Sequence, residues 1–70
     1  MEEIKIKDEF IKLGQALKLA GLAGSGVDAK FMIAEGMVTV NGETEYRRGR
    51  KVHPGDIIEL DGTQVKVSNL

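Results

Sequence analysis

The chain has 70 residues, no cysteine, and a net charge of −1 from 10 basic and 11 acidic residues. This length predicts one domain spanning residues 1–70, with a small core. The lack of cysteine excludes disulfides and cysteine metal sites. One histidine cannot assemble a zinc site, so we expect no metal and no cofactor. The near-neutral balance argues against a protein that coats nucleic acid nonspecifically, so any polyanion site must be local.

Membrane association and secretion are not expected. No apolar run approaches the roughly 20 residues that a membrane-spanning helix needs. The first residues, Met1-Glu2-Glu3-Ile4-Lys5, do not have the pattern of a signal peptide. Together with the absence of cysteine, these features predict a cytoplasmic protein without a membrane partner.

The first third of the chain predicts a strand and then a helix. Two isoleucines alternate with lysines over residues 3–7, which is typical of a short strand. From Phe10 to Ala20, apolar residues recur at the three- and four-residue spacing of a helix. Gly14 lowers the helix propensity of this segment by about 1 kcal/mol relative to alanine. Gly21 is expected to end the helix.

A second helix is predicted over residues 24–36. Ser25 is a candidate N-cap with Asp28 at the third helical position, and Gly36 supplies a C-terminal stop. The helix has two apolar faces. The first comprises Ala29, Met32 and Ile33, and the second comprises Val27, Phe31 and Ala34. With few aromatics available for a small core, we expect Phe10 and Phe31 to be packed in it, Phe31 beneath the N-terminal strand.

The second half of the chain predicts strands joined by tight turns. Strands are expected over residues 38–40, 44–46, 57–60 and 64–67. Asn41-Gly42 and Asp61-Gly62 favour hairpin turns, and His53 to Asp56 suits a type II turn. The predicted fold class is α+β, with two short helices packed on a small, mainly antiparallel sheet in the order β-α-α-β-β-β-β.

One dense basic cluster follows the first hairpin. Arginine fits phosphate in a bidentate fork, and each neutralised phosphate contributes salt-dependent affinity. Gly49 permits a sharp turn inside the cluster. The alternative is a solvated loop that neutralises Glu43 and Glu45. The cluster consists of Arg47, Arg48, Arg50 and Lys51.

Several residues recur together in a recognisable arrangement. They are Leu13-x-x-x-Leu17, then Gly21-Leu22, then Ser25-x-x-x-Ala29-x-x-Met32-Ile33-x-x-Gly36-x-Val38-x-Val40-Asn41-Gly42, and later Val52-x-x-Gly55-Asp56-x-Ile58. This pattern, over about residues 12–60, resembles the αL RNA-binding motif, the domain type named for small-subunit ribosomal protein S-four. It is most similar to the YaaA/YbcJ-like small bacterial proteins. The resemblance implies RNA binding through the two helices and the adjacent hairpin.

The resemblance also suggests particular contact residues. Lys12 and Lys30 match basic positions of the family, whereas Gly14 stands where the family often has Asp, and Gly26 where it often has Arg. These two departures make the basic cluster the main candidate for RNA binding. The main RNA-binding candidates are Lys12, Lys30, Arg47, Arg48, Arg50 and Lys51. Secondary candidates, each with an ordinary structural alternative, are Lys18, Phe31, Asn41 and Tyr46.

The function expected from these observations is non-catalytic RNA binding, directed at structured ribosomal RNA or a ribosomal particle. Ribosomal proteins are further candidate partners, and no small-molecule substrate is expected. The sequence has no paired-acid, metal-loop or phosphate-loop pattern. The alternative is a protein-interaction adaptor that uses the second apolar face of the helix at residues 25–36.

Overall fold

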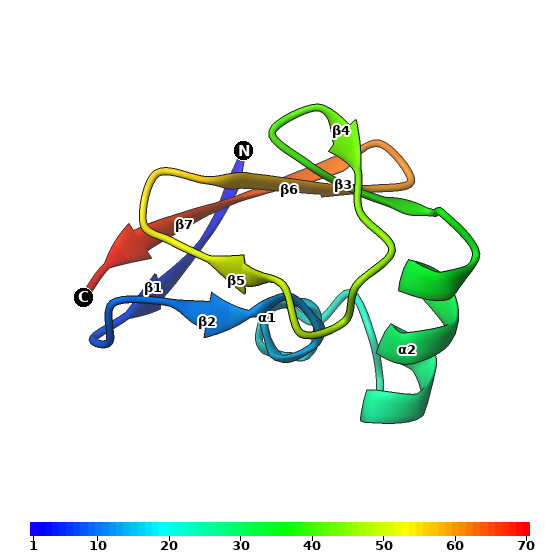
Figure 1. The fold of residues 1–70 in the computed structure, drawn as a ribbon. Coiled ribbons are helices and arrows are strands. Elements are labelled where there is room, and N and C mark those ends of the chain that lie inside the picture. Colours follow the sequence, from blue (N-terminus) through cyan, green and yellow to red (C-terminus); the bar gives the residue numbers. More distant parts are fainter.

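The computed structural model describes residues 1–70 and contains a five-stranded sheet, a two-stranded ribbon and two helices (Figure 1). The elements are β1 (Glu2–Ile6), β2 (Ile11–Lys12), α1 (Leu13–Leu19), α2 (Gly26–Ala34), β3 (Val38–Val40), β4 (Glu43–Thr44), β5 (Lys51–Val52), β6 (Ile57–Leu60) and β7 (Thr63–Asn69). The sheet order is β1-β7-β6-β3-β4, in which only β1 and β7 are parallel. The predicted α+β class, with two helices on a mainly antiparallel sheet, is confirmed.

One face of the sheet forms the core. Both helices and the β2–β5 ribbon lie on this side of the sheet (Figure 1). The alternation along the strands turns valine, isoleucine and leucine inward, while residues such as Glu59 and Lys66 face out. Each buried large aliphatic side chain contributes roughly 1.5–3 kcal/mol. The largest fully buried residues are Leu13, Leu17, Ile33, Ile58, Val38, Val40, Val52, Val65 and Val67.

The predicted caps and turns are present. The Ser25 side chain accepts a hydrogen bond from the Asp28 backbone N–H, at 3.2 Å, and begins α2. Asn41 and Gly42 have φ values of 53° and 86°, the pair of positive angles that a type I′ hairpin turn requires. Neither helix, of seven and nine residues, has the length and apolar character that a membrane-spanning helix requires.

The first helix is shorter than the sequence pattern predicts. It begins at Leu13 rather than Phe10, because residues 11–12 are extended and pair with residues 51–52. The two-residue strands β2 and β5 add to the predicted strand order, and neither is long enough to show an alternating pattern. Likewise, β4 ends at Thr44. The Glu45 N–H still bonds to the Val38 carbonyl, but the N–H groups of Tyr46 and Arg47 bond to a side chain, as described below.

The two phenylalanines are not in the core, contrary to expectation. The Phe31 residue is 61% exposed, and Phe10 is only partly buried. For Phe31 the reason is the orientation of α2, which turns Ala29 and Ile33 toward the sheet and leaves the opposite face in solvent. The buried core consists of aliphatic side chains alone.

Candidate functional site

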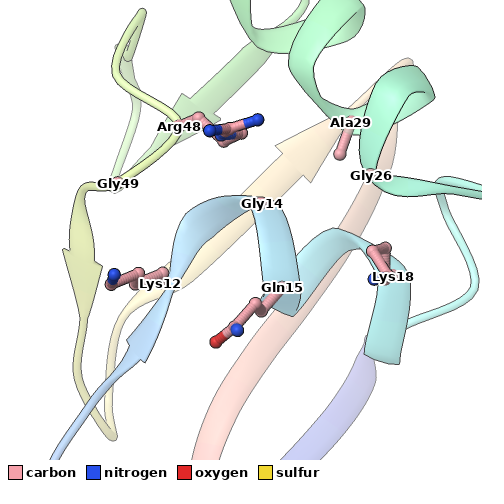
Figure 2. A pocket seen from close by; sticks show the side chains of 8 residues that line it. All are labelled: Lys12, Gly14, Gln15, Lys18, Gly26, Ala29, Arg48 and Gly49. Atoms are coloured by element: carbon pink, nitrogen blue, oxygen red, sulfur yellow. The ribbon is translucent and has the colours of Figure 1, made fainter.

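A shallow groove between α1 and α2 is lined by basic side chains (Figure 2). Its volume is about 320 Å³, and no acidic residue lines it. Glycine or alanine at four positions leaves the floor low, so the longer side chains form the walls. The lining residues are Lys12, Gly14, Gln15, Lys18, Gly26, Ala29, Arg48 and Gly49.

Gly14 brings Arg48 against the first helix. The Gly14 N–H donates to the Arg48 carbonyl at 3.0 Å, and the Leu13 N–H donates to the Arg50 carbonyl at 2.8 Å. A Cβ at Gly14 would lie 2.7 Å from the Arg48 Cγ, closer than carbon atoms can approach. The Arg48 side chain therefore crosses directly over Gly14, and its guanidinium is directed toward α2 (Figure 2).

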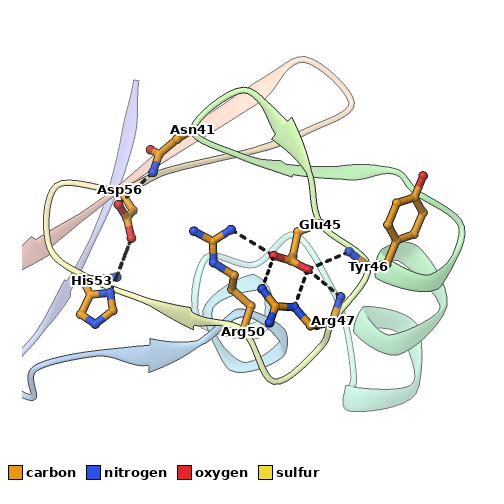
Figure 3. A network of polar contacts seen from close by, with 7 residues as sticks. All are labelled: Asn41, Glu45, Tyr46, Arg47, Arg50, His53 and Asp56. Carbon is orange, nitrogen blue, oxygen red and sulfur yellow. Dashed lines mark hydrogen bonds and ion pairs between the residues drawn. The ribbon is translucent and has the colours of Figure 1, made fainter.

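Glu45 holds the other two arginines of the basic cluster (Figure 3). Its side chain accepts from Arg47 Nε at 3.0 Å and Nη2 at 3.2 Å, and from Arg50 Nη1 at 3.0 Å. It also accepts from the backbone N–H groups of Tyr46 and Arg47, at 3.1 and 3.0 Å. The bonds from the Arg47 side chain contribute most to lowering the Glu45 pKa to about 2 and, with the other donors, outweigh the opposing effect of burial.

Arg48, unlike Arg47 and Arg50, forms no ion pair. Its guanidinium therefore remains free to bind an anion. The sequence alternative of a loop that neutralises nearby acids is thus correct for Arg47 and Arg50 with Glu45. Glu43, the other acid in that alternative, pairs with none of these arginines.

Lys12 and Lys51 are paired across the β2–β5 ribbon. Directly paired residues lie on the same face of two antiparallel strands, so both lysines point outward while Val52 is fully buried. The Lys51 Nζ lies 4.9 Å from the centre of the Phe10 ring, within the range of a cation–π contact. Phe10, which directly precedes β2, therefore packs beside the ribbon and not in the core.

The basic residues form a continuous band. A second hollow, of about 470 Å³, is lined by Arg47, Gly49, Arg50 and Lys51, so it meets the groove at Gly49. Six basic side chains and no acidic ones line the two hollows. We call this surface the basic band, defined by Lys12, Lys18, Arg47, Arg48, Arg50 and Lys51.

Lys30 lies beside the groove without lining it, and Phe31 lies farther around α2. Successive residues of a helix are turned by about 100°, so Lys30 projects about 40° from Gly26, and Phe31 a further 100° around α2. Lys30 therefore stands between the groove and the exposed Phe31 side chain. Lys12, Lys18 and the basic cluster therefore surround one region with Lys30 beside it, whereas Phe31 projects from nearly the opposite side of α2.

Asn41 is fully engaged in the fold (Figure 3). Its Nδ2 donates to Asp56 Oδ1 at 2.9 Å, and its Oδ1 accepts from the Ile57 N–H at 2.9 Å. Burial opposes ionisation of Asp56, but the His53 N–H and the Asn41 amide lower its pKa below the ordinary value. These contacts support the turn interpretation of Asn41.

Tyr46 lies beside the end of α2. A Cβ at Gly36, whose φ is +74°, would be 3.2 Å from the Tyr46 Cε1 atom. The tyrosine residue is 64% exposed. It therefore packs one ring edge against the backbone and leaves much of the ring free for a partner.

Sequence reasoning missed the roles of Gly14 and Glu45. For Gly14 the sequence predicts only a weak helix position and a departure from the family pattern. Glu45 was considered only as a charge that the arginines might neutralise. The signals were a glycine inside a helical pattern and a carboxylate two residues before an arginine, but neither identifies its contact without the fold.

Comparisons with known proteins match almost the whole chain to one family. The family model described as "S4 domain" matches residues 4–68. The chain is 49% identical over 59 residues to a Bacillus subtilis protein named probable ribosome maturation protein RlbA, covering 84% of this chain and 83% of that one. It is 39% identical over 61 residues to the putative RNA-binding protein YbcJ of Escherichia coli, covering 87% of each.

A solved structure agrees with the fold. The solution structure of Escherichia coli YbcJ, described as having an αL motif involved in RNA binding, superposes with a TM-score of 0.69 at 36% identity. The match covers 96% of this chain and 84% of that one.

Proposed function

Because the chain belongs to the S4 domain family, we propose that it is a non-catalytic RNA-binding protein whose target is structured ribosomal RNA or a ribosomal particle. The observation that carries this proposal is the basic band, in which four of the six cationic side chains, Lys12, Lys18, Arg48 and Lys51, form no ion pair. The names of the relatives, one a probable ribosome maturation protein and one a putative RNA-binding protein, support the choice of target. A cytoplasmic site of action follows, because bacterial ribosomes are assembled there.

The band suits the phosphate backbone of a folded RNA. RNA helices are recognised mainly through their shape, phosphates and 2′-hydroxyls, since their deep groove does not admit side chains. Arg48, Lys12 and Lys18 surround the groove and make no ion pair that would have to break. Binding there releases counterions from the RNA, so the affinity should fall steeply as salt increases.

Lys30 and Phe31 extend the proposed contact along α2. Lys30 can reach a phosphate beside the groove, and the exposed Phe31 ring can stack on an unpaired base, an interaction worth about 1–3 kcal/mol in single-strand binding. Tyr46 offers a second exposed ring. Asn41 is assigned no contact, since both atoms of its amide are used within the fold.

The test is binding to purified ribosomal RNA over a salt series. We expect Lys12→Ala/Lys18→Ala/Arg48→Ala to weaken binding about 10- to 100-fold, because up to three phosphate contacts are lost. The slope of log affinity against log salt should become shallower by about 0.7–0.9 per lost phosphate contact. The matched control, Lys5→Ala/Lys7→Ala/Lys66→Ala, removes the same charge from exposed positions outside the band. Equal losses in both variants would show that the band is not the site.

A second candidate function is a protein-interaction adaptor. The observation that favours it is the outward face of α2, where the Val27 and Phe31 residues are 77% and 61% exposed. An adaptor would retain its cellular partners after ribonuclease treatment and lose them on Val27→Ser/Phe31→Ser. Loss of the partners on ribonuclease treatment alone would favour RNA binding.

A further inference from the structure

Glu45 is the one buried charged residue of the protein, and it lies within the basic segment. The residue is 8% exposed, and its carboxylate accepts five N–H groups from Tyr46, Arg47 and Arg50. It lines neither hollow of the basic band. Its position therefore gives it no direct contact with RNA in the proposed site. Its negative charge would also repel a polyanion.

Glu45 is connected to the groove through the backbone of the loop at residues 46–50. The carboxylate fixes the start of the loop at residues 46–47 and, through the guanidinium of Arg50, its end (Figure 3). Within the loop, the Arg50 N–H donates to the Arg47 carbonyl at 3.2 Å. The carbonyls of Arg48 and Arg50 then accept the first N–H groups of α1. The loop is thus held at both ends by Glu45 and docked on α1 in the middle.

This arrangement sets the position of Arg48. Its side chain lies so close over Gly14 that an added Cβ would be 2.7 Å from its Cγ, and its carbonyl accepts the Gly14 N–H, so the loop is held close to α1. If the loop moved outward, the Arg48 guanidinium would leave the groove. Only two of the three cations that line the groove, Lys12 and Lys18, would then remain there. A loop already ordered before binding avoids the entropy loss of ordering it on the RNA.

We propose that Glu45 is a positioning residue for RNA binding, which holds the 46–50 loop so that Arg48 lies over the groove between α1 and α2. This inference rests on the proposed function and deepens it. The carboxylate does not contact the RNA, and it acts through the loop. With Arg47 and Arg50 bound to it, the local charge of the three side chains is still positive, so the repulsion of phosphate by Glu45 is offset.

The proposal predicts an effect opposite in sign to simple electrostatics. Glu45→Gln removes a negative charge beside a polyanion site, yet we expect it to weaken binding to ribosomal RNA about 5- to 20-fold, through lost preorganisation. Glu43→Gln is the matched control, because Glu43 is exposed, two residues away and without a side-chain partner. It should leave affinity unchanged or raise it by up to about twofold, since its charge is screened.

Whether Glu45 holds the 46–50 loop in place can be measured in the free protein, without RNA. Amide hydrogen exchange should show faster exchange at Gly14 and Leu13 in Glu45→Gln, because their acceptors are in the loop, while Val65 in the sheet stays protected. Glu45→Asp keeps the charge with a shorter reach and should bind RNA with an affinity between those of the parent and Glu45→Gln. It also provides the comparison if Glu45→Gln does not fold.

The outcomes separate this inference from the proposed function. If Lys12→Ala/Lys18→Ala/Arg48→Ala binds ribosomal RNA as well as the parent, the proposed site itself is wrong. If that variant loses binding while Glu45→Gln, or Glu45→Asp in its place, binds as tightly as the parent or more tightly, Glu45 is not a positioning residue. Weaker binding with unchanged exchange at Gly14 would also overturn the proposed mechanism.

Discussion

Arg48 and Arg50 are two residues apart and are used in opposite ways. Arg50 points inward to a buried carboxylate, and its side chain is 30% exposed. Arg48 crosses a helical glycine and remains unpaired beside an open groove. The comparison shows that the number of positive charges in a segment is a poor measure of the charge available to a ligand. Part of this basic segment maintains the shape of the loop so that the rest can be presented.

The largest expected effect is on stability, where replacing Glu45, the partner of Arg50, should cost more than replacing Arg48. We expect Glu45→Gln to lower the free energy of unfolding by about 1.5–3 kcal/mol, the range for losing hydrogen bonds to a charged group. Arg48→Ala should change it by less than about 0.5 kcal/mol, as at other surface positions. Urea unfolding measures both values. Equal destabilisation by the two substitutions would mean that Arg48 is also part of the structural network.

The difference in free energy of unfolding between the parent and Glu45→Gln should depend on pH. The pKa of Glu45 is lowered from its ordinary value of 4.5 to about 2, so its stabilising effect is complete above about pH 5 and is lost as the pH falls through about 2. The parent should therefore lose more stability than Glu45→Gln between pH 5 and pH 2, and their unfolding curves should converge. Asp56, whose pKa is also lowered, is present in both proteins and cancels. A constant difference across this range would contradict the assignment.

Two helical glycines of the groove provide a smaller test. Gly14→Ala should weaken binding to ribosomal RNA about three- to tenfold, because the new Cβ displaces the Arg48 side chain. Gly26→Ala is the control, since nothing lies within 4 Å of its added Cβ. Stability should change little in Gly14→Ala, because the gain in helix propensity of about 1 kcal/mol offsets the displacement.

The Arg48→Ala background checks the reason for the Gly14 effect. There the clash is absent, so Gly14→Ala should cause no further loss of RNA affinity. An additional loss of similar size would show that Gly14 affects binding through something other than Arg48.

The smallest expected effect is a gain in affinity. Gly26→Arg adds a cation to the groove at a position with free space, where the family resemblance also implies a basic residue. We expect RNA binding to tighten about threefold, with a steeper salt dependence. No gain at any salt concentration would indicate that the RNA lies along Lys12 and the ribbon instead of reaching α2.

The local features of this chain could be predicted from short stretches of sequence. The cap at Ser25, the turn at Asn41-Gly42 and the strand at residues 57–60 depend on neighbouring residues, and all three are present. The basic segment and Lys12 were also identified as candidates from residue type and resemblance. These predictions needed no knowledge of distant partners.

Tertiary structure decided where those residues point. The pairing of residues 11–12 with 51–52 shortened the first helix and placed Lys12 opposite Lys51. The orientation of α2 exposed Phe31, and the approach of the loop to α1 made Gly14 a contact for Arg48. Such features depend on segments more than 30 residues apart in the chain. The sequence by itself therefore determined the elements and the charge, while long-range packing determined which charges are free.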